Sequence, residues 1–247
     1  MNFMIAAYSD VGIKKHTNQD ALLIKTAQTN LGKVCLCVVC DGMGGLSNGE
    51  LASATVIREM ERWFEHIFPE NIERGFDAGE LKLQWDNIVL EQNIKLGKYA
   101  AARGIRMGTT VAAILIVGGK YYIMNVGDSR VYMLTDRLVL LTKDQTFVQY
   151  EMDSGRMTPE EAAVHPQRNV LLQCVGASDS VTPDFFTGDA MENTVFMLCS
   201  DGFRHVITEQ DERQMRDNAA WLTELNKQRM EVDNISAALV KICQEAG

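Results

Sequence analysis

The sequence predicts an α+β fold with antiparallel sheets, in a single domain that spans residues 1–247. Three observations predict it. The composition is globular, with 46% apolar and 23% charged residues, and a chain of this length can bury a substantial core. Strand-like apolar runs come first, two long helical patterns follow, and further strand-like runs come after them. The links between neighbouring strand patterns are short, whereas parallel strands need crossovers of about a dozen residues or more.

Three strand patterns open the chain. Residues 3–9 and 21–25 are short runs rich in apolar side chains, and residues 34–40 form an unbroken apolar run, VCLCVVC. A run this apolar is typical of a strand that is buried on both faces. The glycine-rich stretch DGMGG follows it and is expected to end the strand.

Two amphipathic helices are predicted next. Over residues 48–68, apolar side chains recur at three- and four-residue intervals, and we expect Pro69 to end this helix. The same spacing recurs over residues 77–102, and Gly104 is expected to stop the second helix.

The middle of the chain predicts an antiparallel meander. Four strand patterns follow one another closely, at 111–117, 121–126, 130–135 and 138–142. The Gly118-Gly119 pair between the first two is typical of a hairpin turn.

The last third of the chain is less regular. Residues 144–169 are polar and predict an excursion over the surface, with a short capped helix at TPEEA. The remaining predictions are strands at 170–175 and 195–199, a helix over 207–230 and a final strand over 235–242.

Charge and cysteine usage restrict the partners and the compartment. The net charge is −9, and no run of five or more Lys or Arg exists, so we expect neither nucleic-acid nor membrane binding. The six cysteines lie mostly in apolar runs, where cysteine behaves as a small hydrophobe, which favours a reducing cytoplasm. The spacing C-x-C-x-x-C could also form a metal cluster, but no matching His or Cys group occurs elsewhere. The chain shows no secretory signal and no apolar run long enough to span a membrane.

Five aspartates lie at the ends of strand patterns, with Gly, Ser or Asn within two residues: Asp20, Asp41, Asp128, Asp201 and Asp233. Each alone reads as an ordinary turn residue, since Asp favours turns. Together they suggest carboxylates gathered at one edge of a sheet pair. Carboxylates that converge cannot all stay ionised without cations, and Mg²⁺ or Mn²⁺ would relieve the repulsion. Two such ions about 3.5–4 Å apart activate water against phosphate esters.

The order of motifs resembles that of the metal-dependent protein phosphatases of type 2C, in particular the bacterial members that consist of a catalytic domain alone. The motifs are SDVG, NQD, VVCDGMGG, GELAS, GTT, NVGDSRVY, LTKDQT, HPQRNVLLQCVG, LCSDG and VDNIS. The resemblance runs from about Ile5 to Ile242. It implies a four-layer α-β-β-α sandwich, in which two packed antiparallel sheets are flanked by helices. Residues 145–170 match a mobile flap beside the cleft.

The resemblance also implies roles for individual residues. Asp41 matches the carboxylate that bridges two catalytic metals, and Gly42 would offer its carbonyl oxygen to one of them. Asp201 and Asp233 match the remaining carboxylate ligands. We therefore expect Mn²⁺ or Mg²⁺ as cofactor, with two ions in the domain.

Two further aspartates have weaker counterparts. Asp20 matches a residue that holds metal-bound water. Asp128 matches the carboxylate that, with Asp201, can hold a third and weaker metal in bacterial members.

The sequence departs from the family pattern at four positions. Lys15 stands where an Arg usually binds the substrate phosphate, and Lys lacks the bidentate fork of Arg. Met43 replaces a His that some members carry, and Gln19 replaces a frequent Glu. Arg204 could face the cleft and supplement Lys15, or it could be a surface residue.

The expected function is hydrolysis of phosphoserine and phosphothreonine in proteins. Two alternatives stay open: a catalytically weakened module that binds phosphoproteins, and a phosphatase for a small phosphorylated metabolite. A serine hydrolase is disfavoured, because Ser129 and Ser200 have no evident His partner in the sequence. The resemblance also implies a Ser/Thr kinase as the counterpart, and we expect a cytoplasmic monomer.

Overall fold

The computed structural model describes residues 1–43, 48–204, 228, 231 and 233–243. Its ten strands form two five-stranded sheets in which every pairing is antiparallel. The first sheet has the order β1-β10-β9-β6-β7, and its strands are Asn2–Asp10, Ile235–Cys243, Val195–Cys199, Arg130–Leu134 and Leu138–Leu140. The second has the order β2-β3-β4-β5-β8, and its strands are Ala21–Thr29, Gly32–Cys40, Val111–Val117, Lys120–Val126 and Asp184–Asp189.

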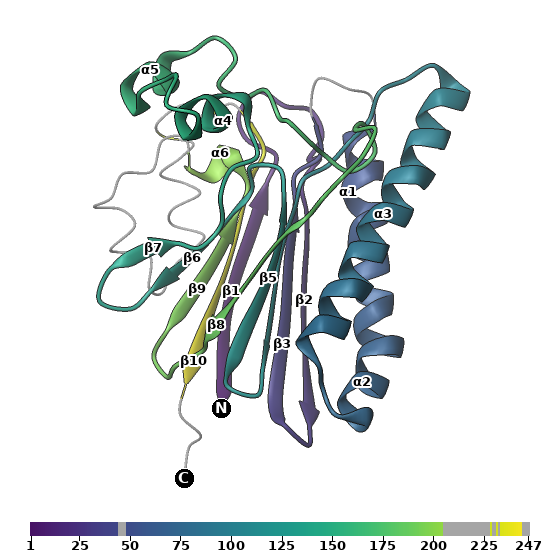
Figure 1. Ribbon diagram of the computed structural model, residues 1–247, viewed down its shortest axis with the longest axis vertical. Coiled ribbons are helices and arrows are strands. Elements are labelled where there is room, and N and C mark those ends of the chain that lie inside the picture. The colour runs from purple at the N-terminus through teal and green to yellow at the C-terminus, as the bar shows by residue number, and fades with distance from the viewer. Residues whose placement is uncertain (44–47, 205–227, 229–230, 232, 244–247) are drawn as a thin grey trace.

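Helices cover the outer face of the second sheet, as Figure 1 shows. They are α1 (Gly49–Arg62), the π-helical turn η1 (Trp63–Ile67), α2 (Phe68–Arg74) and α3 (Ala78–Arg103). Three short helices, α4 (Phe147–Asp153), α5 (Pro159–Val164) and α6 (Asp201–Arg204), lie at one end of the sandwich. Among the described helices, none combines the length and apolar character that a membrane span requires.

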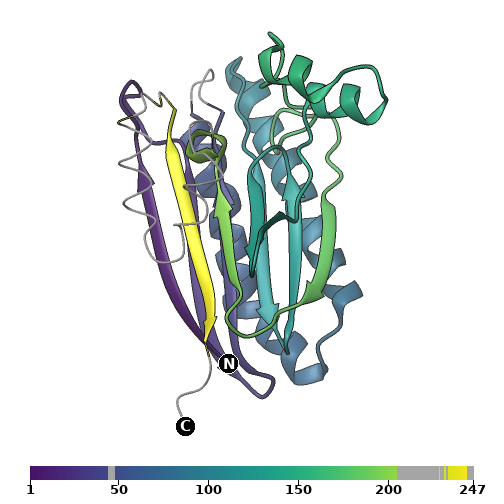
Figure 2. The ribbon, with the colours of Figure 1, turned by 90° about the vertical axis from the view of Figure 1, so that its left-hand side faces the viewer.

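The strand β3 shows how the sequence builds two core layers. Its alternate residues Val34, Leu36 and Val38 pack toward the helices, while Cys35 and Cys37 pack toward the first sheet. Side chains alternate between the two faces of a strand, so a fully apolar run can fill both layers at once. In the turned view of Figure 2, the helices α1 and α3 lie behind the strands, on the far side of the sandwich. The predicted fold class, two packed antiparallel sheets with flanking helices, is confirmed.

Two predictions about elements were wrong. Pro69 does not end a helix, because the chain passes through η1 and Pro69 lies in the first turn of α2, where the missing N–H costs little. Residues 170–175 form no strand and make only isolated bridges, Leu171 to Thr146 and Val175 to Thr109.

The strand β8 was missed, since DFFTGD contains Asp and Gly, which are depleted in strands. The short helices α4 and α6 were missed as well. The predicted helix over 207–230 falls outside the described residues, apart from position 228.

Candidate metal centre

The ends of several strands meet around a pocket of about 250 Å³ at one end of the sandwich. Its lining residues are Lys15, Asp41, Met43, Thr110, Asp128, Asn169, Leu171, Asp201 and Asp233. β3 and β9 end just before Asp41 and Asp201, and β10 begins just after Asp233. Because neighbouring strands are antiparallel, a strand end and a strand start lie at the same edge. The fold therefore brings four of the five predicted aspartates into one pocket, which we call the metal pocket.

Backbone hydrogen bonds fix Asp41 at the end of β3. Its N–H donates to Thr110 Oγ1 at 2.9 Å, and its carbonyl oxygen accepts from Thr110 N at 2.9 Å and from Thr109 Oγ1 at 3.0 Å. The Thr110 hydroxyl also lies 2.7 Å from Ser129 Oγ. These bonds explain why the pair Thr109-Thr110 stands opposite the aspartate.

Gly42 has no room for a side chain. Its N–H donates to Gln19 O at 3.1 Å, and a Cβ atom there would lie 2.4 Å from Gly49 O and 2.5 Å from Gln19 O. Both clashes are with backbone, so neither neighbour could yield by a rotamer change. The Gln19 carbonyl also accepts from Ser53 Oγ at 2.6 Å, which ties α1 to the same point.

Lys15 and Asp233 form an ion pair inside the metal pocket, with Nζ 2.9 Å from Oδ1. Asp233 Oδ1 also accepts from Asn234 N at 2.8 Å. The loop that carries Lys15 is held by Asn234, whose Nδ2 donates to the carbonyls of Val11 at 2.9 Å and Thr17 at 3.1 Å.

Asp128 is 6% exposed and sits between the metal pocket and two arginines. Arg204 Nη2 lies 3.3 Å from Asp128 Oδ2 and 3.6 Å from Asp144 Oδ2. Burial, followed by the charge of Asp201, raises the pKa of Asp128 to about 7, although Arg204 and Arg130 oppose the rise. Arg204 therefore contacts Asp128 and does not line the metal pocket beside Lys15.

Asp20 is buried behind the metal pocket and does not line it. Burial raises its pKa to about 7, the hydroxyls of Ser236 and Ser200 offset part of the rise, and Asp201 and Asp233 add to it. Both carboxylate oxygens nevertheless lack a hydrogen bond of good geometry among the described residues. A buried carboxylate without hydrogen bonds lowers the stability of the fold unless a water molecule or a cation binds its oxygens.

Asp41 is a second buried carboxyl group whose charged form is unfavourable. Burial raises the pKa of Asp41 well above its usual value, and repulsion from Asp20, Asp201 and Asp128 raises it further. Its carboxyl group is also within hydrogen-bonding reach of Asp201. Divalent cations are the chemistry that lets such a group of carboxylates stay ionised.

The donor set fits hard cations such as Mg²⁺ and Mn²⁺, which prefer oxygen ligands. In the described part of the chain, no group of three or more His, Cys, Asp or Glu side chains could hold an ion by itself. Mg²⁺ sites commonly combine one or two carboxylates with waters, so a pocket that offers carboxylates in pairs is compatible with such ions.

Several residues of the site went unnoticed in the sequence. Thr110 appeared only as part of the GTT motif, and Asn169 and Leu171 were placed on a surface excursion and on a strand rather than in the lining. Asn234 was noted only as the neighbour of Asp233, whereas its side chain anchors the N-terminal loop. An Asn directly after a pocket aspartate was the only available signal.

A pocket lined by four aspartates at one end of two packed antiparallel sheets offers the oxygen ligands that hard divalent cations prefer. The protein phosphatase 2C family model matches residues 13–242, so this chain belongs to the protein phosphatase 2C family.

Named relatives agree with this assignment. The protein phosphatase PhpP of Streptococcus pneumoniae is 30% identical over 251 residues, which cover 98% of each chain. The serine/threonine protein phosphatase PstP of Mycobacterium tuberculosis is 32% identical over 213 residues, which are 83% of this chain. The chain spans only 37% of the length of PstP.

Solved structures agree as well. The serine/threonine phosphatase of S. agalactiae superposes with a TM-score of 0.85 and 28% identity, covering 98% of this chain and 100% of that one. The catalytic domain of PstP, solved in complex with two manganese ions, superposes with a TM-score of 0.78 and 28% identity, covering 98% and 99%.

Proposed function

We propose that this protein is a metal-dependent serine/threonine protein phosphatase. The observation that carries the proposal is the metal pocket, where four aspartates from distant parts of the chain line one cavity. Burial and repulsion between the carboxylates raise the pKa of Asp41 and of Asp128, and a bound cation would offset both effects. The relatives named as protein phosphatases, and the two manganese ions in the PstP catalytic domain, support the same assignment.

The metal-binding roles are those that the family resemblance implies, and four of the aspartates concerned line the metal pocket. Asp41, the Gly42 carbonyl, Asp201 and Asp233 would hold two Mn²⁺ or Mg²⁺ ions. Asp128 would contribute to a third, weaker site, and Asp20 would hold a water from behind. When bound, such ions supply a water of lowered pKa and neutralise phosphoryl oxygens.

Lys15 would bind the phosphate group of the substrate. Its ammonium lies in the metal pocket and is paired with Asp233, so it is already held where an anion would enter. Lys acts as a point charge, and it orients a phosphate less strictly than the fork of an Arg. Met43 lines the same pocket with an apolar side chain, and it cannot donate a proton to the leaving group.

Residues 145–170, which include α4 and α5, would form the flap. Asn169 in this segment and Leu171 just after it line the metal pocket, so a shift of the segment would change the shape of the pocket entrance. We also propose that the protein works in the cytoplasm as a monomer, opposite a Ser/Thr kinase. The six cysteines, all free, support a reducing compartment.

The test is hydrolysis of p-nitrophenyl phosphate and of a phosphothreonine peptide, with Mn²⁺ and with EDTA. Turnover of both that depends on Mn²⁺ is expected. Folded protein that turns over neither substrate would remove the proposal. Turnover confined to small phosphorylated metabolites would instead favour the metabolite phosphatase.

A second candidate is a phosphoprotein-binding module with weak catalysis. Lys15 in place of Arg, held by Asp233, and Met43 in place of His favour it. The variant Lys15→Arg separates the two candidates. A large gain in turnover would indicate a weakened site, whereas an unchanged rate would indicate that Lys15 suffices or is not needed.

A further inference from the structure

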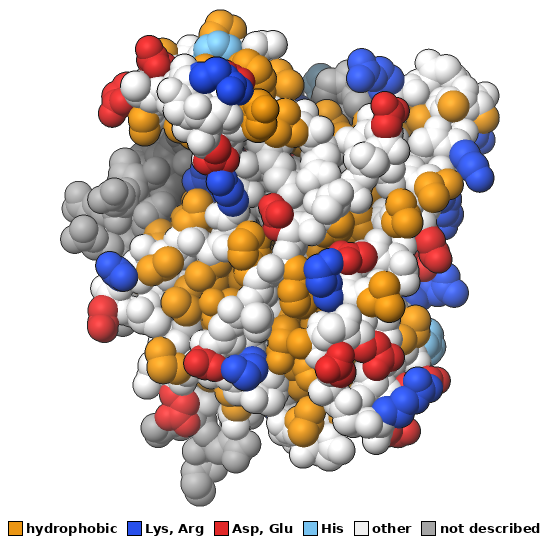
Figure 3. Space-filling view, viewed as in Figure 1, with side chains coloured by type: hydrophobic (Ala, Val, Ile, Leu, Met, Phe, Trp, Pro, Cys, Tyr) orange, Lys and Arg blue, Asp and Glu red, His pale blue; other side chains and the backbone are white. Residues whose placement is uncertain are grey.

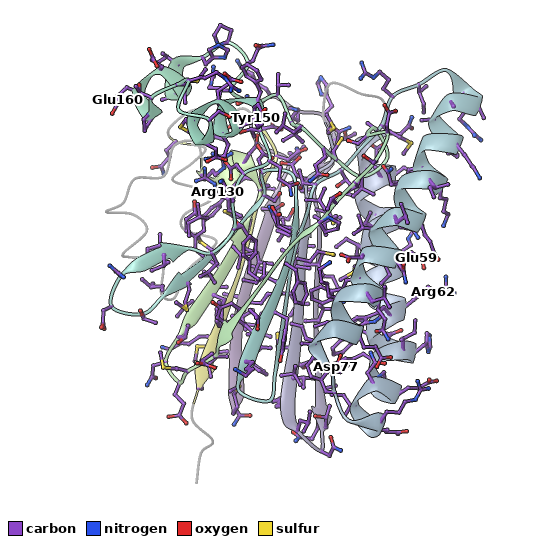
Figure 4. All side chains as sticks on the ribbon, in the orientation of Figure 1. Glu59, Arg62, Asp77, Arg130, Tyr150 and Glu160 are labelled. Atoms are coloured by element: carbon purple, nitrogen blue, oxygen red, sulfur yellow. The ribbon has the colours of Figure 1, made fainter. Side chains whose placement is uncertain are left out.

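A second pocket, which we call the arginine pocket, lies beside the metal pocket. Its volume is about 430 Å³, and its walls come from α4, α5, β6 and the residues near Asn169 and Arg204. Asn169 lines both pockets, so the two are neighbours. Figure 4 places Arg130 beneath α4, which carries Tyr150.

The arginine pocket is cationic. Arg130, Arg168 and Arg204 line it, against a single carboxylate, Asp144. Both oxygens of Asp144 are engaged by Arg130, at 2.8 Å from Nε and 2.8 Å from Nη2, so its charge is already compensated. Figure 3 shows basic and acidic side chains meeting on this face, below the place of α4.

The guanidinium groups differ in how far they are already engaged. Arg204 is shared between Asp128 and Asp144 at 3.3 and 3.6 Å, and its Nε is buried, so it adds positive charge to the wall but no accessible donor at that atom. Arg168 is exposed and forms no salt bridge within the described ranges. A guanidinium presents five donors in a planar fork that matches a carboxylate or a phosphoryl group.

Part of the remaining lining is apolar. Val148, Met152 and Ala162 face the same space. A side chain with an aliphatic stem and an anionic head could pack its stem here and present its head to the arginines.

We propose that the arginine pocket binds an acidic side chain of the peptide substrate that flanks the phosphorylated residue. The inference rests on the proposed function, because Asn169 joins this pocket to the one that would take the phosphate. The enzyme then selects phosphopeptides by local negative charge. Arg168 supplies the contact farthest from the metal pocket, and Arg204 links the two pockets through Asp128.

The experiment compares three phosphothreonine peptides, flanked by Glu, by Gln or by a second phosphothreonine, with p-nitrophenyl phosphate as a substrate too small to reach the arginine pocket. Wild type is expected to favour the Glu peptide over the Gln peptide by about tenfold in kcat/KM, the scale of one charge-assisted hydrogen bond. The doubly phosphorylated peptide shows whether a phosphoryl group is accepted in place of the carboxylate.

The decisive variant is Arg168→Glu, which is expected to abolish the preference for the Glu peptide. Its matched control is Lys98→Glu, an equal charge reversal on the exposed side of α3, which is expected to retain it. Loss of the preference in both variants would indicate long-range steering by net charge and overturn the pocket assignment. A wild type that hydrolyses the peptides without preference would overturn the inference and leave the proposed function standing.

A binding measurement tests the inference without any need for turnover. Fluorescence anisotropy with the labelled Glu peptide and metal-free protein is expected to give a Kd about tenfold weaker for Arg168→Glu than for wild type or Lys98→Glu. Equal Kd values in all three proteins would overturn the inference, even if no substrate were hydrolysed.

Discussion

The two neighbouring pockets differ in the sign of their charge and in the structure that supports them. The metal pocket gathers aspartates at the ends of core strands, fixed by backbone hydrogen bonds such as Asp41 N to Thr110 Oγ1. The arginine pocket takes most of its walls from the short helices α4 and α5 and from Arg168. The difference teaches that rigid strand ends can hold carboxylates close together until a cation or a proton neutralises them. The region of α4 and α5 supplies the groups that could contact a substrate.

The largest expected effect is on the acidic side of this comparison. Asp201→Asn removes one negative oxygen from the metal pocket and is expected to lower turnover at least about a hundredfold, since a metal-held group supplies several kcal/mol. Steady-state kinetics with p-nitrophenyl phosphate and Mn²⁺ measure the loss. The control is Asp189→Asn, an exposed aspartate paired with Lys120. A fully active Asp201→Asn protein would exclude Asp201 from the metal centre.

Manganese should stabilise the folded protein. At a free concentration about a hundred times its Kd, an ion that binds only the folded state adds about 2.7 kcal/mol, which corresponds to roughly 5–10 °C in Tm for a chain of this size. Thermal unfolding with Mn²⁺ or with EDTA measures the shift. Asp41→Asn should lose most of it, and an equal shift in that variant would place the ion elsewhere.

Gly42→Ala tests the rigidity of the strand end. The new Cβ would meet two backbone carbonyls, so we expect a loss of about 1–3 kcal/mol in the free energy of unfolding, measured by urea titration. Gly97→Ala is the matched control, because its nearest contact would be an ordinary 3.7 Å to Gly176 O. In a helix that change should be neutral or stabilise the protein by up to about 1 kcal/mol. Equal effects at both positions would contradict the argument.

Lys15→Gln should have the smallest effect of the four. It removes a point charge that is 29% exposed, so we expect KM for a phosphothreonine peptide to rise about tenfold, or about 1.4 kcal/mol, with a smaller change in kcat. The separate values of kcat and KM decide the result. A change in kcat alone would indicate that Lys15 acts on Asp233 rather than on substrate.

The sequence predicted the parts of the molecule that depend on local pattern. The apolar run that ends at Cys40 and the glycine beside Asp41 correctly predicted where a buried strand ends. Contacts between distant segments could not be read this way. Asn234 binds loop carbonyls at Val11 and Thr17, and nothing in its neighbouring residues indicates that role. The strand β8 was hidden for a related reason, since its pairing with β5 outweighs its weak intrinsic preference.

The anchoring of the N-terminal loop by Asn234 has a consequence for synthesis. Gln19 N donates to Asn234 Oδ1 at 2.9 Å across 215 positions of the chain, and β1 pairs with β10 along its whole length. A nascent polypeptide therefore carries β1 without its paired strand until β10 has left the ribosome. Activity would therefore require β10 and Asn234. A truncated product that contains Asp201 but lacks them would be inactive.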